Sequence, residues 1–262
     1  MTLDVAAVTE LVERVAREIV TPRFRALAPE DIGAKGPGDV VTIVDTEAET
    51  EISRGLNAVL PGVPVVGEEG VAADPTLLEG LGAPLAWVVD PLDGTRAFIE
   101  GLPEHAVMVA LLERGQSVAG WICLPALGRT YVAERGSGAT CNGRTLSRRP
   151  PADPMTGAAS LGIPVRWRAA LETSPASSGI ALDGRLWSGY YYSQVADGVL
   201  DALVYQRAHP WDHAPGAAIV RELGGAVLRP DGAEYAPGSG EGGLVVGASP
   251  VAARTVLGVL SG

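Results

Sequence analysis

The chain of 262 residues has little cysteine, few aromatic residues and fewer basic than acidic residues. Its two cysteines, Cys123 and Cys141, are too few for a disulfide framework or a cysteine-based zinc site. The roughly 18 consecutive apolar residues that a membrane-spanning helix needs do not occur. The 20 Lys and Arg residues are outnumbered by 31 Asp and Glu residues. The resulting net charge of −11 argues against a nucleic-acid partner, which requires a basic surface.

The N-terminal residues also lack the basic flank and the apolar core of a secretory signal, so we expect a cytoplasmic protein. Hydrophobic residues make up 47% of the chain and charged residues 19%, which is typical of a globular fold and excludes wholesale disorder. A small anionic substrate remains compatible with the negative charge, because a bound cation reverses the sign of the local field.

The spacing of apolar residues predicts an alternation of helices and strands. Helices are expected at 4–21, 46–60, 191–198, 212–223 and 250–260. Strands are expected at 63–66, 85–89, 106–112, 117–123, 130–134, 157–162, 202–205 and 244–247, and residues 33–39 are expected to form a glycine-rich loop. Prolines 150, 151 and 154 mark a turn-rich join between an N-terminal part, 1–150, and a C-terminal part, 151–262. This pattern predicts an α/β or α+β fold built from layers.

Several carboxylates follow directly after apolar segments, where a rigid backbone would aim their side chains. Glu68 and Glu69 follow the strand expected at 63–66, and Asp90 follows the strand expected at 85–89. Asp93 comes three residues after Asp90, and Asp212 stands at the head of an expected helix. Like charges that converge in this way repel one another unless a cation lies between them. Oxygen ligands without His or Cys favour a hard cation such as Mg²⁺.

The segment Asp90-Pro91-Leu92-Asp93-Gly94-Thr95 adds features that suit a phosphate group. A tight turn at the proline would leave the carbonyl oxygen of Leu92 free as a neutral metal ligand. Gly94 allows the backbone to approach a ligand closely, and Thr95 offers a hydroxyl and an N–H group at an expected helix start. Carboxylates beside a phosphate cradle indicate metal-assisted phosphate chemistry.

With these motifs the chain resembles the inositol monophosphatase family of Mg²⁺-dependent, lithium-sensitive phosphatases, from about Leu3 to Leu260. The resemblance is carried by Gly67-Glu68-Glu69, by Trp87 to Thr95, by Trp211 to Ala217 and by the upstream stretch Gly38 to Asp45. It implies one domain, 1–262, with the αβαβα sandwich of the inositol monophosphatase and fructose-1,6-bisphosphatase type. It also implies a homodimer.

The resemblance further implies a role for individual residues. Two to three Mg²⁺ ions per active site are expected, held by Glu68, Asp90, the carbonyl of Leu92, Asp93 and Asp212. Asp45 and Thr95 correspond to the pair that orients the attacking water, and Glu68 belongs to the catalytic set. Asp93, Gly94, Thr95 and Asp212 are expected to contact the substrate. Lys35 matches a loop lysine near the active site, and Glu69 has a secondary role.

The chain departs from the family pattern where the leaving group would bind. Inositol-hydrolysing members have a glutamate seven residues before the last metal-binding aspartate, and that position is Tyr205 here. Tyr190 lies in the stretch that replaces the small residues of the same pocket, so Tyr190 and Tyr205 are expected to line it.

The leading hypothesis is a Mg²⁺-dependent phosphomonoesterase that acts on a small phosphorylated metabolite, such as inositol 1-phosphate or a related polyol or sugar phosphate. Histidinol phosphate and nucleotide or sugar bisphosphates are alternatives within the family. A non-catalytic regulator that binds a phosphorylated ligand is the alternative from another functional class.

Overall fold

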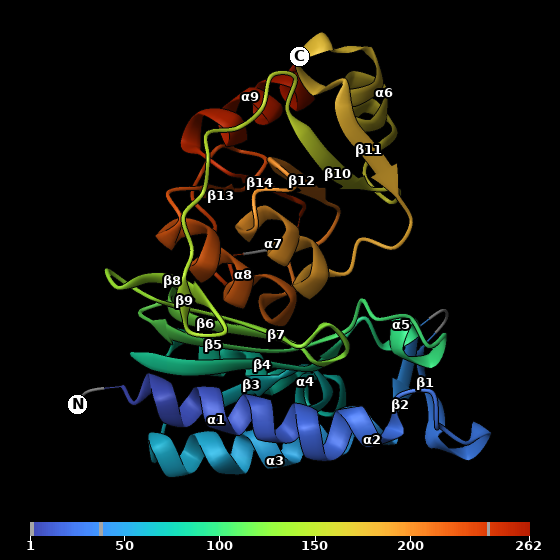
Figure 1. Ribbon diagram of the computed structural model, residues 1–262, viewed down its shortest axis with the longest axis vertical. Helices are drawn as coiled ribbons and strands as arrows, with labels where there is room; N and C mark the ends of the chain where they lie inside the picture. The colour runs from blue at the N-terminus through green and yellow to red at the C-terminus, as the bar shows by residue number, and fades with distance from the viewer. Residues whose placement is uncertain (1–2, 37–38, 240–241) are drawn as a thin grey trace.

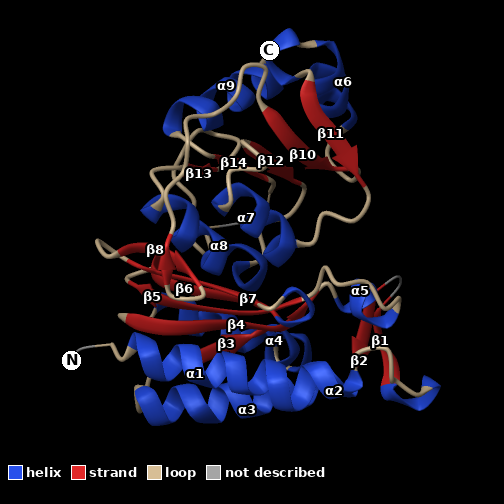
Figure 2. Cartoon of the chain, viewed as in Figure 1, coloured by secondary structure: helices blue, strands red, loops and turns tan. Residues whose placement is uncertain are grey.

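The computed structural model describes residues 3–36, 39–239 and 242–262, which form five alternating layers of helices and strands (Figure 1). A pair of long helices lies on the outer face of a seven-stranded sheet. A central helical layer separates this sheet from a five-stranded sheet, and two further helices cover the far side of that second sheet (Figure 2). The predicted αβαβα sandwich is confirmed. No helix of the described part of the chain is long and apolar enough to cross a membrane.

The first helical layer follows from two amphipathic segments. Helix α1 (Val5–Val15) continues through a π-helical turn (Ala16–Val20) into the short α2 (Thr21–Arg23). Its apolar residues recur every three or four positions and are buried, which confirms the predicted helix at 4–21. Helix α3 (Ile43–Val59) begins three residues before the expected start at 46.

The seven-stranded sheet has the order β3-β4-β5-β6-β7-β8-β9, in which only the β3–β4 pair is parallel. Its long central strands carry buried side chains on both faces, because helices cover both sides. The strands are β3 (Val65–Gly67), β4 (Leu85–Asp93), β5 (Ala106–Glu113), β6 (Gln116–Leu124), β7 (Arg129–Glu134), β8 (Gly138–Cys141) and β9 (Arg144–Thr145).

The central layer consists of α7 (Ser188–Ala196) and α8 (Pro210–Glu222), which pack between the two sheets. Helix α8 contacts the first sheet so closely that a Cβ atom at Gly120 of β6 would lie 2.4 Å from the carbonyl oxygen of Pro215. A side chain at Gly120 would therefore push the helix away from the sheet.

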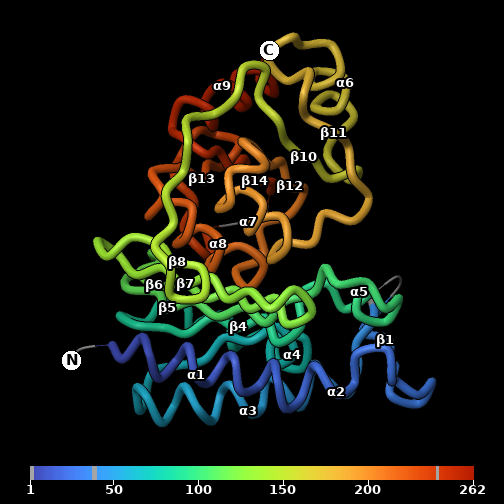
Figure 3. Tube along the Cα trace, in the orientation of Figure 1, coloured from blue at the N-terminus to red at the C-terminus, as the bar shows by residue number. Residues whose placement is uncertain are grey.

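The second sheet has the order β11-β10-β12-β14-β13 and is covered by α6 (Val165–Thr173) and α9 (Pro250–Ser261). Its strands are β10 (Thr156–Ser160), β11 (Gly179–Asp183), β12 (Ala202–Tyr205), β13 (Ala226–Leu228) and β14 (Leu244–Gly247). The connection from β9 to β10 runs past the central helices to this sheet (Figure 3), and the turn-rich join predicted near residue 150 falls within it. Arg148 anchors the connection through a buried ion pair with Asp201 at 2.8 Å.

The expected glycine-rich loop at 33–39 is wrong where the structure describes it. Residues on both sides pair as an antiparallel hairpin of β1 (Ile32–Gly36) and β2 (Asp39–Thr42), while residues 37 and 38 lie outside the described residues. Other short elements had no apolar period to reveal them. They are α4 (Glu68–Ala73), α6, β8, β9, β11 and β13.

Candidate active site

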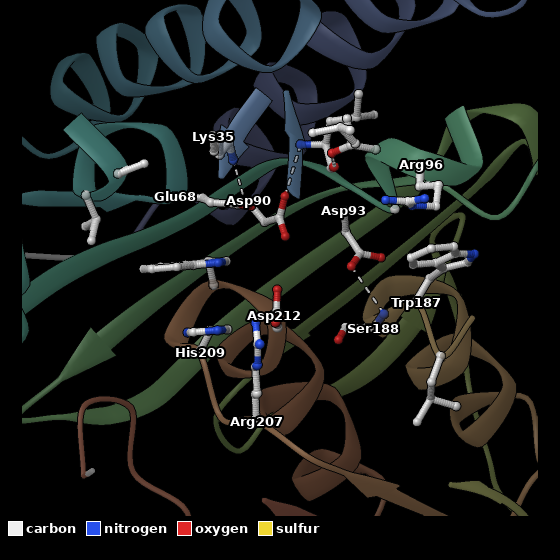
Figure 4. A pocket seen from close by; sticks show the side chains of 18 residues that line it. Lys35, Glu68, Asp90, Asp93, Arg96, Trp187, Ser188, Arg207, His209 and Asp212 are labelled. Atoms are coloured by element: carbon white, nitrogen blue, oxygen red, sulfur yellow. Dashed lines mark hydrogen bonds and ion pairs between the residues drawn. The ribbon is translucent and has the colours of Figure 1, made fainter. Parts of the chain in front are cut away.

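Three carboxylates converge between the first sheet and the central helices (Figure 4). Asp90 and Asp93 lie at the end of β4, and Asp212 lies in the first turn of α8. Each offers an oxygen, and these ligand atoms lie within 4.8 Å of one another. The three aspartates predicted as metal ligands are therefore brought together by two elements far apart in the sequence.

An irregularity in β4 explains how Asp90 and Asp93 share one face. Residues three apart in a regular strand point to opposite faces of the sheet. Here Asp90 pairs with Met108 and Asp93 with Ala106, so β4 has one residue more than β5 over this interval. A bulge of this kind turns the extra residue out of register. Both carboxylates then point toward α8.

The carboxylate cluster carries unfavourable charge repulsion when no cation is bound. Burial raises the pKa of Asp90 well above its ordinary value, and the neighbouring Glu68, Asp93 and Asp212 raise it further. Burial also raises the pKa of Asp93 to about 7, and burial together with nearby carboxylates raises the pKa of Asp212. A site of this composition fits Mg²⁺, because a divalent cation would remove the repulsion and the donors are all oxygens.

The N-terminus of α7 holds the side chain of Asp93. The backbone N–H of Ser188 donates to Oδ1 of Asp93 at 3.2 Å, and that of Gly189 donates to Oδ2 at 2.8 Å. A Cβ atom at Gly189 would lie 2.6 Å from Cβ of Ala106, so a larger residue would separate the helix from Asp93. These bonds fix the orientation of the carboxylate before any ligand binds.

Asp45 is buried at the start of α3 and faces the end of β4. Its Oδ2 accepts hydrogen bonds from the backbone N–H of Thr42 at 2.8 Å and from the Thr42 hydroxyl at 2.6 Å. The first of these bonds belongs to a capping box, in which the Thr42 side chain in turn accepts from the backbone N–H of Asp45. Its Oδ1 lies 3.0 Å from the hydroxyl of Thr95. Burial raises the pKa of Asp45, and the bonds from Thr42 and Thr95 oppose that shift.

The hairpin β1–β2 brings Lys35, which the resemblance assigns to a loop near the active site, next to two carboxylates. Its Nζ lies 2.8 Å from Oε1 of Glu68 and 2.5 Å from Oε1 of Glu69. Burial alone would lower the pKa of Lys35, but the two carboxylates outweigh it and raise the pKa. Burial raises the pKa of Glu69 to about 7 in spite of this ion pair. Glu68 lines the cavity of the site, and Glu69 is connected to the site through Lys35.

The turn from β4 into α5 (Thr95–Ile99) forms one edge of the site. Gly94 has a φ of 76°, in the left-handed region that favours glycine. A Cβ atom there would also lie 2.7 Å from the carbonyl oxygen of Glu104. Both observations explain why a glycine precedes the first N–H groups of α5, which have no partner within the helix.

The carboxylates open into a cavity of about 590 Å³, which is also lined by residues that were not expected there from the sequence. Arg96 and Trp187 lie on one side of it, and Arg207 and His209 lie on another (Figure 4). Trp211 also lines the cavity. The rings of His209 and Trp211 stack with centroids 5.3 Å apart and an interplanar angle of 1°. Arg207, His209 and Trp211 lie close to Asp212 in the sequence, and this proximity was the available sign that they line the cavity.

The structure places Tyr190 and Tyr205 away from this cavity, contrary to expectation. Tyr205 is 5% exposed and packs in the core between Tyr192 and His213, with ring centroids 5.8 Å and 4.6 Å away. Tyr190 lines a smaller neighbouring cavity of about 250 Å³, which shares Trp187 with the main one. All four residues of β12 are buried, because the strand is covered on both faces, and Tyr205 therefore lies in the core.

Comparisons with known proteins agree with this geometry. A sequence profile of the inositol monophosphatase family matches residues 3–260. An inositol-1-monophosphatase from Mesorhizobium japonicum is 34% identical over 232 residues, covering 86% of this chain and 84% of that protein. A histidinol-phosphatase from Chlorobaculum parvum is 32% identical over 231 residues, covering 86% and 85%.

A solved structure of an IMPase from Thermotoga maritima superposes with a TM-score of 0.79 at 25% identity, over 97% of this chain and 94% of that chain. This superposition agrees with the fold described above. The chain belongs to the inositol monophosphatase family, whose members are phosphoric monoester hydrolases.

Proposed function

We propose that the protein is a Mg²⁺-dependent phosphomonoesterase for a small phosphorylated metabolite, with inositol 1-phosphate or a related polyol or sugar phosphate as the leading substrate. The convergence of Asp90, Asp93 and Asp212 beside the start of α5 carries this proposal. A cation would relieve the repulsion among three carboxylates with raised pKa values, and the N–H groups of a helix start, which have no carbonyl partner within the helix, suit a phosphate group. Both requirements meet in one cavity.

Two to three Mg²⁺ ions would be held by Glu68, Asp90, the carbonyl oxygen of Leu92, Asp93 and Asp212. When bound, Mg²⁺ would polarise the phosphate and lower the pKa of a water molecule. The chain itself contributes a rigid frame for these ligands. The backbone of α7 holds Asp93, and the N–H of Leu92 donates to Oδ1 of Asp90 at 3.1 Å.

Asp45 and Thr95 would orient the attacking water. The Thr95 hydroxyl donates to Asp45 or to the carbonyl of Leu92, and its oxygen remains an acceptor for a proton of that water. The hydrogen bonds from Thr42 hold the side chain of Asp45, so its Oδ1 stays in place as an acceptor for the Thr95 hydroxyl. The N–H groups of Gly94 and Thr95 would bind the phosphate oxygens.

Histidinol phosphate is a second candidate substrate. The stacked rings of His209 and Trp211 give the cavity a flat aromatic wall, which suits a planar leaving group such as imidazole. The histidinol-phosphatase similarity supports this candidate.

Arg96 and Arg207 also line the cavity, and their charge would suit the second phosphate of a nucleotide or sugar bisphosphate.

A panel of phosphorylated metabolites tests the proposal. Inositol 1-phosphate, histidinol phosphate and a sugar bisphosphate are each incubated with the protein, with Mg²⁺ or with EDTA, and released phosphate is measured. We expect release with Mg²⁺ and none with EDTA. Binding of the same compounds in calorimetry without any phosphate release would contradict the proposal and favour a non-catalytic regulator.

The finer family expectations are proposals of the same kind. We infer a homodimer, inhibition by Li⁺ and a cytoplasmic location. Light scattering coupled to size exclusion gives the oligomeric state, and a Li⁺ titration at fixed Mg²⁺ gives the inhibition. A monomer at micromolar concentration, or full activity at high Li⁺, would contradict the respective proposal.

A further inference from the structure

Helix α3 sends a second carboxylate toward the metal-binding segment that follows β3. Glu49 lies one helical turn after Asp45, so both side chains leave the same face of α3. Oε2 of Glu49 accepts the backbone N–H of Glu69 at 2.8 Å, and Oε1 accepts the backbone N–H of Gly70 at 2.7 Å. One carboxylate therefore binds both of these N–H groups of α4.

These two N–H groups belong to the first turn of α4, where the N–H groups of a helix have no carbonyl partner within the helix. The first N–H groups of a helix have no carbonyl partner within it, and a side chain at the N-cap position normally accepts one of them. In α4 the N-cap residue is Gly67, which has no side chain for this purpose. Glu49, which lies on α3, therefore caps α4 in place of an N-cap side chain.

The backbone around Glu68 is shaped to receive this carboxylate. A Cβ atom at Gly67 would lie 2.3 Å from Cδ of Glu49, and one at Gly70 would lie 3.1 Å from Oε1 of Glu49. The glycines on both sides of the pair Glu68-Glu69 thus leave the space that the carboxylate occupies. Two short hydrogen bonds and close packing fix the backbone that carries Glu68.

We infer that Glu49 is a positioning residue for Glu68. It acts through the backbone of Glu69 and Gly70, and it orients the Glu68 side chain toward the cavity in which Asp90 and Asp93 lie. The inference rests on the proposed function, because it takes Glu68 to be a Mg²⁺ ligand. Residues that orient metal ligands commonly contribute ten- to hundredfold to metal affinity.

Replacement of Glu49 by Gln tests the inference with little change of shape. The glutamine side chain has one acceptor oxygen, so one of the two N–H groups faces an NH₂ group and loses its partner. We expect the dissociation constant of Mg²⁺, measured by calorimetry on the metal-free protein, to rise about tenfold. Turnover at saturating Mg²⁺ should remain within about threefold of the wild type, since Glu49 touches neither substrate nor metal.

Two further variants separate positioning from general stability. Gly67→Ala keeps Glu49 but places a methyl group in the space of its carboxylate, and it should weaken Mg²⁺ binding in the same way. Glu47→Gln is the matched control on the same helix, because Glu47 pairs with Arg23 at 2.8 Å, away from α4. It should bind Mg²⁺ like the wild type. All titrations are run well below the unfolding temperature of each variant.

The inference is overturned if Glu49→Gln binds Mg²⁺ with wild-type affinity, or if Glu47→Gln weakens binding as much. Glu68→Gln distinguishes this failure from failure of the proposed function. If Glu68→Gln weakens Mg²⁺ binding while Glu49→Gln does not, only the positioning role is lost. If Glu68→Gln has no effect on Mg²⁺ binding, Glu68 is no ligand and both proposals for it fail.

Discussion

The hydroxyl oxygen of Thr95, the first residue of α5, lies 3.0 Å from Oδ1 of Asp45, in the first turn of α3. The same hydroxyl lies 3.0 Å from the carbonyl oxygen of Leu92. A hydroxyl has one proton and two acceptor lone pairs, so it can donate to only one of these oxygens at a time. Its oxygen then remains available to accept a proton from a water molecule.

This geometry predicts the behaviour of Thr95→Ala. If the hydroxyl orients the attacking water, its removal should lower kcat by about 10²-fold, with a change in KM below about threefold. The melting temperature should fall only slightly, because the helix cap is Gly94 and the Thr95 hydroxyl bonds to groups at the site. Steady-state kinetics and thermal unfolding of the same sample give both values.

Thr95→Ser is the control, because it keeps the hydroxyl and removes only a methyl group. It should retain at least a tenth of the wild-type kcat. A Thr95→Ala variant with unchanged kcat would show that the hydroxyl has no catalytic role.

Asp90→Asn should separate activity from stability. Asp90 is a proposed Mg²⁺ ligand, so loss of its charge should lower activity by at least about 10³-fold. The metal-free protein should instead melt at a higher temperature than the wild type, because charge repulsion with Glu68, Asp93 and Asp212 is relieved.

Thermal unfolding with EDTA and with saturating Mg²⁺ checks the second half of this expectation. Mg²⁺ should stabilise the wild type strongly and the Asp90→Asn variant little, because a ligand that binds only the folded state raises its stability. Near-normal turnover by the variant at low Mg²⁺ would remove Asp90 from the metal site.

Much of the fold could be predicted because its signals are local. The apolar period of 4–21 and the strands around 85–89 and 202–205 all stand in the structure close to their expected places. The start of α3 was placed too late, since the capping box of Thr42 and Asp45 lies before the apolar period. The β1–β2 hairpin was missed because its strands are short and rich in glycine.

The convergence of the carboxylates was predictable, whereas the geometry that produces it was not. The sequence suggested a tight turn at the proline between Asp90 and Asp93, but a bulge within β4 puts both carboxylates on one face, and a bulge depends on the partner strand. The contact of Glu49 with α4 is equally invisible, because it joins residues 20 or more positions apart through backbone N–H groups. Sequence position also says nothing of which way Tyr205 points.

Stability should depend on pH through two buried histidines. Burial lowers the pKa of His105, which packs against Phe24 and Phe98, and lowers the pKa of His213 to about 3. Unfolding restores a pKa near 6.5, so below that pH the unfolded chain binds more protons than the folded one. Each histidine therefore costs stability as the pH falls below about 6.5, until the pH reaches the lowered pKa of that histidine in the folded protein.

The variant His105→Asn isolates one of these contributions. Urea unfolding in EDTA at pH 7 and pH 5 gives the change in unfolding free energy for both proteins. The carboxylate cluster acts in the opposite direction, because raised pKa values cost stability as the pH rises, but it is common to both. The wild type should lose more unfolding free energy than the variant over this interval, by at most about 2 kcal/mol. Equal losses would show that His105 is protonated in the folded state.

The last prediction concerns Tyr205, for which the structure leads to a different expectation from that of the sequence. From the sequence, Tyr205→Glu would supply the acceptor that inositol-hydrolysing relatives use and would shift the preference toward inositol 1-phosphate. Because Tyr205 packs between Tyr192 and His213 and is 5% exposed, a glutamate there would bury a charge among aromatic rings. We expect destabilisation by about 3 kcal/mol or more and no gain in specificity.

Tyr205→Phe is the matched variant. The buried Tyr205 hydroxyl makes no hydrogen bond of good geometry with the residues that the structure describes, so its removal should change the unfolding free energy by less than about 1 kcal/mol. The ratio of kcat/KM for inositol 1-phosphate and histidinol phosphate should stay unchanged in this variant, because Tyr205 does not line the cavity. A stable Tyr205→Glu protein that favours inositol 1-phosphate would instead place this side chain in the substrate pocket and refute the packing argument.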